Sequence, residues 1–84
     1  MMNCKLIFVD ATGLKCPLPV LKARKALQSL ETGSRIRVIS TDPASPLDFK
    51  HFCGSKGHVL VSINEEKDKI EFVIEKGEDQ EIPS

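Results

Sequence analysis

The spacing of apolar residues changes repeatedly along this chain, and each change predicts a new secondary-structure element. A continuous apolar run over residues 5–9, which stops at Asp10, predicts a buried strand. The spacing then becomes helical, with apolar positions at Val20, Ala23, Leu27 and Leu30. We expect this helix to begin at Pro17, where a missing N–H has no cost, and to stop at Gly33.

The second half of the pattern repeats this alternation. Residues 35–40 are rich in Ile and Val and predict a second strand, parallel to the first because a helix separates the two. A second short helix should follow, with Ser45 as its N-cap, Pro46 as its first residue and Asp48 as the capping-box partner of Ser45. Its apolar contacts are Leu47, Phe49, Phe52 and Cys53, and its end is expected near Gly54 or Gly57.

Two more strands complete the order βαβαββ. Residues 59–64 predict the third strand. The alternation of Ile70, Phe72 and Ile74 with Glu71, Val73 and Glu75 predicts a fourth strand, buried on one face. The fold class is therefore α/β: a two-layer sandwich with both helices on one face of a four-stranded mixed sheet. We expect one domain over residues 1–84, with a loosely held tail over 78–84.

Composition narrows the function classes. The chain has 84 residues, and 12 basic and 12 acidic residues give a net charge of zero, which argues against a direct nucleic-acid binder. Three widely spaced cysteines, at positions 4, 16 and 53, do not fit a secreted disulfide scaffold. The apolar run near the N-terminus is too short for a signal peptide or a membrane span. We therefore expect a cytoplasmic protein with reduced thiols.

Cys16 is the strongest candidate for chemistry. It follows a turn at Gly13 and precedes Pro17, which places it where a strand gives way to a helix. Unpaired N–H groups at a helix start stabilise a thiolate, and so do nearby cations, which predicts a lowered pKa for Cys16. Pro17 and Pro19 start the helix and should also hold the thiol at a fixed angle. The structural alternative is that Cys16 is a small buried core residue.

The remaining candidates have weaker support. Cys53 could resolve a Cys16 intermediate as a disulfide, but its apolar setting beside Phe52 favours a core role. Cys4 has no assigned role. His51 and His58 could join Cys53 in a metal site, yet no closely spaced ligand pair typical of zinc occurs. No glycine-rich phosphate loop is present. Chemistry at a cysteine thiolate requires no metal or organic cofactor, and none is expected.

The run Gly13-Leu14-Lys15-Cys16-Pro17-Leu18-Pro19 resembles the hallmark Cys-Pro-x-Pro motif of the TusA/SirA family of small sulfur carriers, and the likeness continues in Asp42-Pro43-Ala44, Phe52-Cys53 and Gly57-His58. The resemblance implies the same fold. It also implies that Cys16 accepts sulfane sulfur as a persulfide from a cysteine desulfurase or a rhodanese-like donor. The sulfur would pass to an acceptor protein in tRNA thiolation, sulfur oxidation, molybdenum-cofactor supply or selenium metabolism.

One residue departs from the tRNA-thiolation branch of the family, whose motif reads Cys-Pro-Glu-Pro. Leu18 stands where that branch has glutamate, and this change makes the surface beside the thiol more apolar. The motif therefore does not identify the partner protein or the pathway. The basic residues Lys22, Arg24 and Lys25 could dock acidic partners, or could simply form a solvated helix face. The alternative function is a redox-sensing or regulatory interaction module without sulfur transfer.

Overall fold

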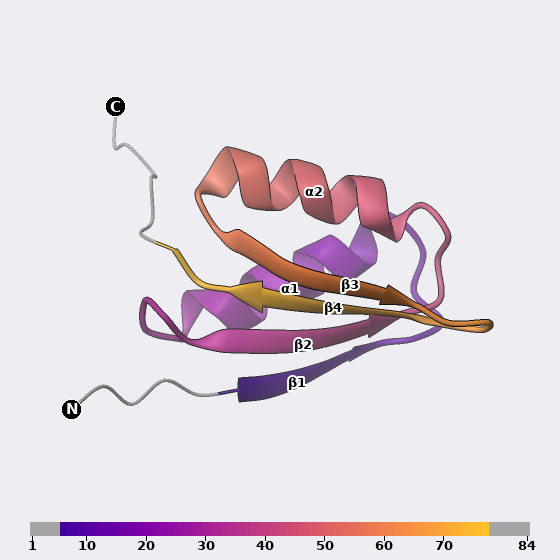
Figure 1. The fold of residues 1–84 in the computed structure, drawn as a ribbon, viewed down its shortest axis with the longest axis horizontal. Coiled ribbons are helices and arrows are strands. Elements are labelled where there is room, and N and C mark those ends of the chain that lie inside the picture. Colours follow the sequence, from indigo (N-terminus) through magenta and orange to yellow (C-terminus); the bar gives the residue numbers. More distant parts are fainter. Residues whose placement is uncertain (1–5, 78–84) are drawn as a thin grey trace.

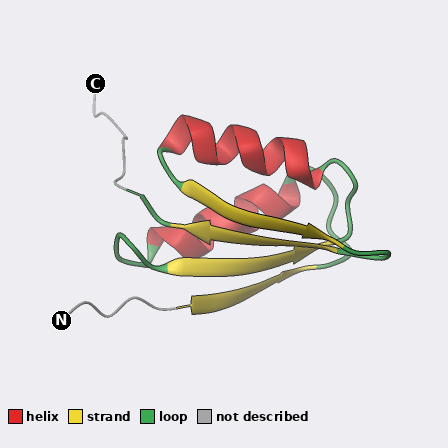
Figure 2. Cartoon of the chain, viewed as in Figure 1, coloured by secondary structure: helices red, strands yellow, loops and turns green. Residues whose placement is uncertain are grey.

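The computed structural model describes residues 6–77, which form two helices and a four-stranded sheet (Figures 1 and 2). The elements follow the predicted order βαβαββ. They are β1 (Leu6–Ala11), α1 (Leu18–Gln28), β2 (Arg35–Ser40), α2 (Ser45–Lys56), β3 (Val59–Glu65) and β4 (Ile70–Glu75).

The sheet is mixed, with strand order β1-β2-β4-β3. Strand β1 pairs parallel to β2, with Leu6 opposite Arg35, which confirms the predicted βαβ unit. Strand β4 runs antiparallel to both β2 and β3. Because β1 and β2 are parallel, the loops that leave their carboxyl ends, before α1 and α2, lie at the same edge of the sheet (Figure 1).

The core lies between the sheet and the two helices, which cover one face. Alternate residues of the strands supply Val9, Ala11, Ile36, Val38, Phe72 and Ile74. The helices contribute Ala23 and Leu27 from α1, and Phe49, Phe52 and Cys53 from α2. The rings of Phe49 and Phe72 lie 4.4 Å apart and join α2 to the sheet. These contacts confirm the predicted two-layer α/β sandwich.

The prediction that the first strand is buried was wrong for most of its length. Leu6 is 63% exposed and Phe8 58% exposed, and only Val9 and Ala11 are buried. Strand β1 lies at the edge of the sheet and extends to Ala11, and its alternate side chains point to the face that carries no helix. A continuous apolar run therefore does not guarantee burial on both faces.

Both helix starts differ from the predicted caps. Pro17 is the N-cap of α1, and the helix begins one residue later, at Leu18. Ala44 is the N-cap of α2, and the Ser45 hydroxyl lies 2.5 Å from the hydroxyl of Ser40 in a buried hydrogen bond. Asp48 forms no capping box with Ser45. The reason is that Asp42 already holds this helix entry, where its carboxylate accepts a hydrogen bond from the Ala44 N–H at 3.0 Å.

The end of α2 matches the prediction. Gly57 has φ +79°, a left-handed conformation that favours glycine and closes the helix. The tail at 78–84 and Cys4 lie outside the described residues. Within residues 6–77, neither helix combines the length and apolar character that a membrane crossing requires.

Candidate functional site

Cys16 lies in the loop between β1 and α1, at the sheet edge where the loop between β2 and α2 also lies (Figure 1). Its thiol is free and its side chain is exposed. The alternative that Cys16 is a core residue is therefore wrong. Backbone N–H groups of this loop donate hydrogen bonds to side chains of the β2–α2 loop, and the Cys16 thiol donates to a side chain in the first turn of α2.

Two backbone N–H groups tie the Cys16 loop to the neighbouring loop. The Gly13 N–H donates to the Thr41 hydroxyl at 2.9 Å, and the Cys16 N–H donates to Asp42 Oδ2 at 2.5 Å. Gly13 has φ +80°, and a Cβ built there would meet no atom within 4 Å. The need for glycine at this position is therefore conformational rather than steric. The result is a loop that presents the thiol at a defined position.

The thiol itself faces two carboxylates. The Cys16 S–H donates a hydrogen bond to Asp48 Oδ2, on the first turn of α2. This hydrogen bond raises the pKa of Cys16 above its ordinary value, with further contributions from desolvation and from the negative charges of Asp48 and Asp42. The predicted lowering of the Cys16 pKa was wrong. The charged groups that shift it are the carboxylates of Asp48 and Asp42, and no lysine or arginine is among them.

Asp42 is held in its ionised form. Hydrogen bonds from the Ala44 and Cys16 N–H groups lower the pKa of its carboxyl group, with a smaller contribution from the charge of Lys15. The same carboxylate thus holds the loop before α2, fixes the Cys16 backbone and adds negative charge beside the thiol. The site is consequently anionic around a protonated thiol.

The start of α1 has one buried side and one exposed side. Pro19 is fully buried and fixes the helix start against the core. Pro17 is exposed next to the thiol, and the peptide bond between Cys16 and Pro17 is cis. Leu18 and Leu21 are each about half exposed and, three residues apart, share one face of the helix. Apolar surface therefore borders the thiol.

The basic residues of α1 do not form one surface. Lys22 donates a hydrogen bond to the Asp10 carbonyl oxygen, and both Lys22 and Lys25 line a hollow over β1. Arg24 lines a different pocket, together with Phe52 and Lys56 of α2. A partner that docks at the Cys16 loop can therefore meet these charges on either side of α1.

Cys53 occupies the opposite environment. It is only 3% exposed and belongs to the core, as the sequence predicted. Burial raises the pKa of its thiol to about 11. His51 is exposed on α2, while His58 precedes β3 and accepts a hydrogen bond from the Gly77 N–H. In the described part of the chain, no three His, Cys, Asp or Glu side chains are grouped as metal ligands.

Sequence reasoning missed the two carboxylates that face the thiol. Asp48 was assigned to a capping box, and Asp42 was noted only within the Asp42-Pro43-Ala44 run. They lie 32 and 26 residues from Cys16 along the chain, so local spacing could not reveal the contacts. The parallel pairing of the first two strands was the available signal, because it places the loops that follow these strands side by side.

Comparisons with known proteins show the family of the chain. Residues 7–76 match the family model described as sulfurtransferase TusA. The chain belongs to the TusA family. It is 44% identical over 68 residues to the sulfur carrier protein TusA of Allochromatium vinosum, which covers 81% of this chain and 90% of that protein. The crystal structure of a SirA-like protein from Desulfitobacterium hafniense has a TM-score of 0.74 and 31% identity, covering 86% of this chain and 99% of that one.

Proposed function

We propose that this protein is a sulfur carrier that holds sulfane sulfur as a persulfide on Cys16. The observation that carries the proposal is the exposed thiol on a loop tied down by Asp42 and Thr41, in a chain that belongs to the TusA family. Apolar surface at Leu18 and Leu21 borders the thiol and offers a partner a place to dock.

In the loading step, Cys16 reacts as a thiolate with the outer sulfur of a donor persulfide. A bond forms between Cys16 Sγ and that sulfur, while the donor's S–S bond breaks and the donor leaves as a thiolate. The proton lost by Cys16 passes to the donor thiolate or to water. One S–S bond replaces another, so no external oxidant or reductant is needed.

In the delivery step, an acceptor thiolate attacks the outer sulfur of the Cys16 persulfide. The S–S bond to Cys16 breaks, and the Cys16 thiolate that leaves takes up a proton from water. The raised pKa of Cys16 means that the restored group is a thiol, which again donates its hydrogen bond to Asp48.

The raised pKa also implies that activation depends on the partner. In the free protein the thiol is protonated at neutral pH and therefore reacts slowly. A cation brought by a docked partner to Asp42 and Asp48 would offset their charge and lower the pKa of Cys16. We propose that thiolate formation is coupled to docking, which limits side reactions of the unloaded thiol outside the donor complex.

The partners implied are a cysteine desulfurase or a rhodanese-like donor and a downstream acceptor protein. We propose that four residues of α1 contribute to docking: Leu18, Lys22, Arg24 and Lys25. We also propose that tRNA thiolation or a related branch of sulfur metabolism receives the sulfur. The protein would be cytoplasmic. A reducing compartment would keep the two described thiols, Cys16 and Cys53, free.

The test is to incubate the protein with a cysteine desulfurase and cysteine, and then to measure its mass and map the modified peptide. We expect the gain of one sulfur atom on Cys16, released by dithiothreitol and passed to an acceptor thiol protein. Oxidation of Cys16 to a sulfenic acid without sulfur loading would contradict the carrier role and support a redox sensor. Sensor cysteines typically have a low pKa, whereas the pKa of Cys16 is raised in the free protein.

A further inference from the structure

Loading Cys16 with sulfur changes the contact between its side chain and α2. In the unloaded protein the Cys16 S–H donates a hydrogen bond to Asp48 Oδ2, and the Cys16 N–H donates to Asp42 Oδ2 at 2.5 Å. In the loaded protein, a persulfide has a sulfur atom in place of the thiol proton, so Cys16 Sγ can no longer donate to Asp48. Loading therefore removes the hydrogen bond that holds the unloaded thiol.

The outer sulfur of the persulfide meets the same carboxylates in a less favourable way. It lies about 2 Å beyond Sγ, so the side chain must move before the outer S–H could donate to Asp48. A persulfide is also more acidic than the thiol from which it forms, and at neutral pH it is an anion. The charges of Asp42 and Asp48 destabilise an anion, whereas the hydrogen bond to Asp48 stabilises the neutral thiol. The site thus distinguishes the unloaded from the loaded state.

The charge of this pair of carboxylates is not neutralised by the described residues. Among residues 6–77, no ion pair involves Asp42 or Asp48. Lys15, in the same loop as Cys16, acts on Asp42 through its charge and makes only a smaller contribution than the two N–H groups that bind this carboxylate. Both carboxylates are therefore available to act on the sulfur of Cys16.

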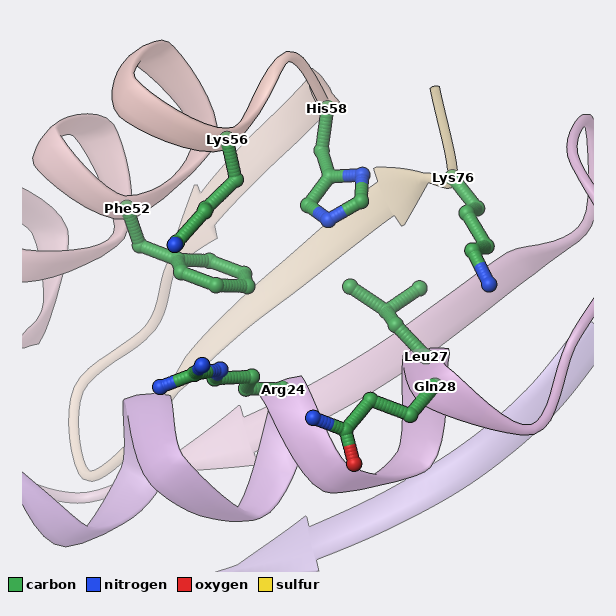
Figure 3. Close-up of a pocket in the computed structure, with 7 residues that line it drawn as sticks. All are labelled: Arg24, Leu27, Gln28, Phe52, Lys56, His58 and Lys76. Carbon is green, nitrogen blue, oxygen red and sulfur yellow. The ribbon is translucent and has the colours of Figure 1, made fainter. Parts of the chain in front are cut away.

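The cations of the helices lie away from these carboxylates. Figure 3 shows Arg24 and Lys56 in the lining of a pocket between the second halves of α1 and α2. Both helices begin at the sheet edge that carries Cys16, so this pocket lies toward the opposite end of the molecule (Figure 1). Lys22 and Lys25 line the hollow over β1. The negative charge beside Cys16 is therefore not offset from the helices.

We propose that Asp48 sets the equilibrium of sulfur transfer, because it stabilises the unloaded form of Cys16 and destabilises the loaded form. This inference rests on the proposed function and concerns the direction of transfer. In the exchange, a bond forms between Cys16 Sγ and the outer sulfur of the donor as the donor's S–S bond breaks, and the thiol proton passes to the departing thiolate. Because Asp48 favours the thiol side of this exchange, Cys16 passes sulfur on readily and stores it poorly.

The test is the exchange equilibrium between the full chain and a mixture of glutathione persulfide and glutathione at pH 7. Intact mass after alkylation gives the loaded fraction, and peptide mapping assigns it to Cys16. Asp48→Asn should raise the equilibrium constant for loading roughly two- to fivefold, the effect of one partly exposed charge. Asp48→Glu keeps the charge and should give a value between those of Asp48→Asn and the wild type. Asp68→Asn, on the exposed β3–β4 turn, is the matched control and should leave the constant unchanged.

The pH dependence separates this role of Asp48 from a structural one. At pH 7 the exchange converts a protonated thiol into a persulfide anion, so the Asp48 carboxylate opposes loading. As the pH rises through the pKa of Cys16, the unloaded form also becomes an anion, and Asp48 then repels both forms. The difference in loading between the wild type and Asp48→Asn should therefore shrink, whereas a structural effect of the substitution would persist at high pH.

The outcomes distinguish this inference from the carrier role itself. Equal loading of the wild type and Asp48→Asn at pH 7, or the same gain in Asp68→Asn, would overturn the inference and leave the carrier role intact. A gain in Asp48→Asn that stays constant as the pH rises would also overturn it. If Cys16 acquires no sulfur in any of these proteins, the proposed function fails, and this inference fails with it.

Discussion

Cys16 and Cys53 are two free thiols in one small fold, and both have a raised pKa for different reasons. Cys53 is buried in the core on α2, and loss of solvent alone raises the pKa of its thiol to about 11. Cys16 is exposed, and the carboxylates of Asp48 and Asp42 raise the pKa of its thiol through a hydrogen bond and through charge.

The two causes differ in whether the pKa of the thiol can change while the protein stays folded. Desolvation in a packed core persists unless the protein unfolds, so Cys53 stays inert in the folded state. Asp42 and Asp48 are only partly buried, and a cation that approaches their carboxylates would offset their effect on the pKa of Cys16. We therefore propose that Cys16 is protonated in the free protein and is activated by a docked partner, while Cys53 is a packing residue.

The largest expected effect is the loss of sulfur loading when Cys16, but not Cys53, is replaced. Cys16→Ser should abolish sulfur loading completely, because no other exposed thiol is found within residues 6–77. The fold should survive, since the side chain contributes little packing. Mass spectrometry after incubation with a cysteine desulfurase measures loading, and thermal unfolding measures stability. A loaded Cys16→Ser protein would reverse the assignment of the two thiols.

The second effect falls on stability. Cys53→Ser should lower the free energy of unfolding by roughly 1–3 kcal/mol, because a hydroxyl group replaces a thiol in an apolar core. Urea unfolding followed by circular dichroism measures this loss, and Cys53→Ala controls for the removal of the sulfur atom. Sulfur loading of the folded Cys53→Ser protein should equal that of the wild type. A large loss of loading at unchanged stability would instead indicate that Cys53 takes part in transfer.

The sequence predicted the strands and helices that position the site better than it predicted the charges around the thiol. The strand at 35–40 and the alternation in β4 were found correctly, since both strands lie in the middle of the sheet and their patterns reflect the core directly. The exposure of Leu6 and Phe8 was not predicted, because edge position depends on which strands pair and not on local spacing. The sign of the Cys16 pKa shift was missed for a related reason, since Asp48 is distant in sequence.

The third prediction removes the carboxylate that distinguishes Cys16. Asp48→Asn should lower the pKa of Cys16, because it removes the negative charge beside the thiol and replaces the charged acceptor of the thiol's hydrogen bond by a neutral amide. Alkylation by iodoacetamide near pH 7 should become several-fold faster. In the wild type, the rate should rise with pH to a midpoint above the ordinary value of 9.0. Asp68→Asn, on the β3–β4 turn, is the control and should leave the profile unchanged.

The outcome of that experiment also decides how the thiol is activated. If Asp48→Asn accelerates alkylation but changes loading from a protein donor much less, the donor already offsets the carboxylates on docking. If the wild-type midpoint lies well below 9.0, the helix start dominates after all, and coupling between docking and thiolate formation loses its basis.

The smallest expected effect concerns the approach of the partner. Replacing Arg24 and Lys25 together by Glu should slow transfer from a protein donor several-fold at low salt, because exposed charges mainly change the rate of encounter. The effect should shrink at high salt, and loading by a small-molecule persulfide should change little. The single variants sharpen the result, since Arg24 lies beside α2 and Lys25 over β1. The single variant with the slower transfer identifies the side of α1 that the protein donor contacts when it reaches Cys16. If the double variant changes transfer from neither the protein donor nor the small-molecule persulfide, docking depends on the apolar surface at Leu18 and Leu21. Leu18→Glu should then slow transfer from the protein donor more than the charge reversals do.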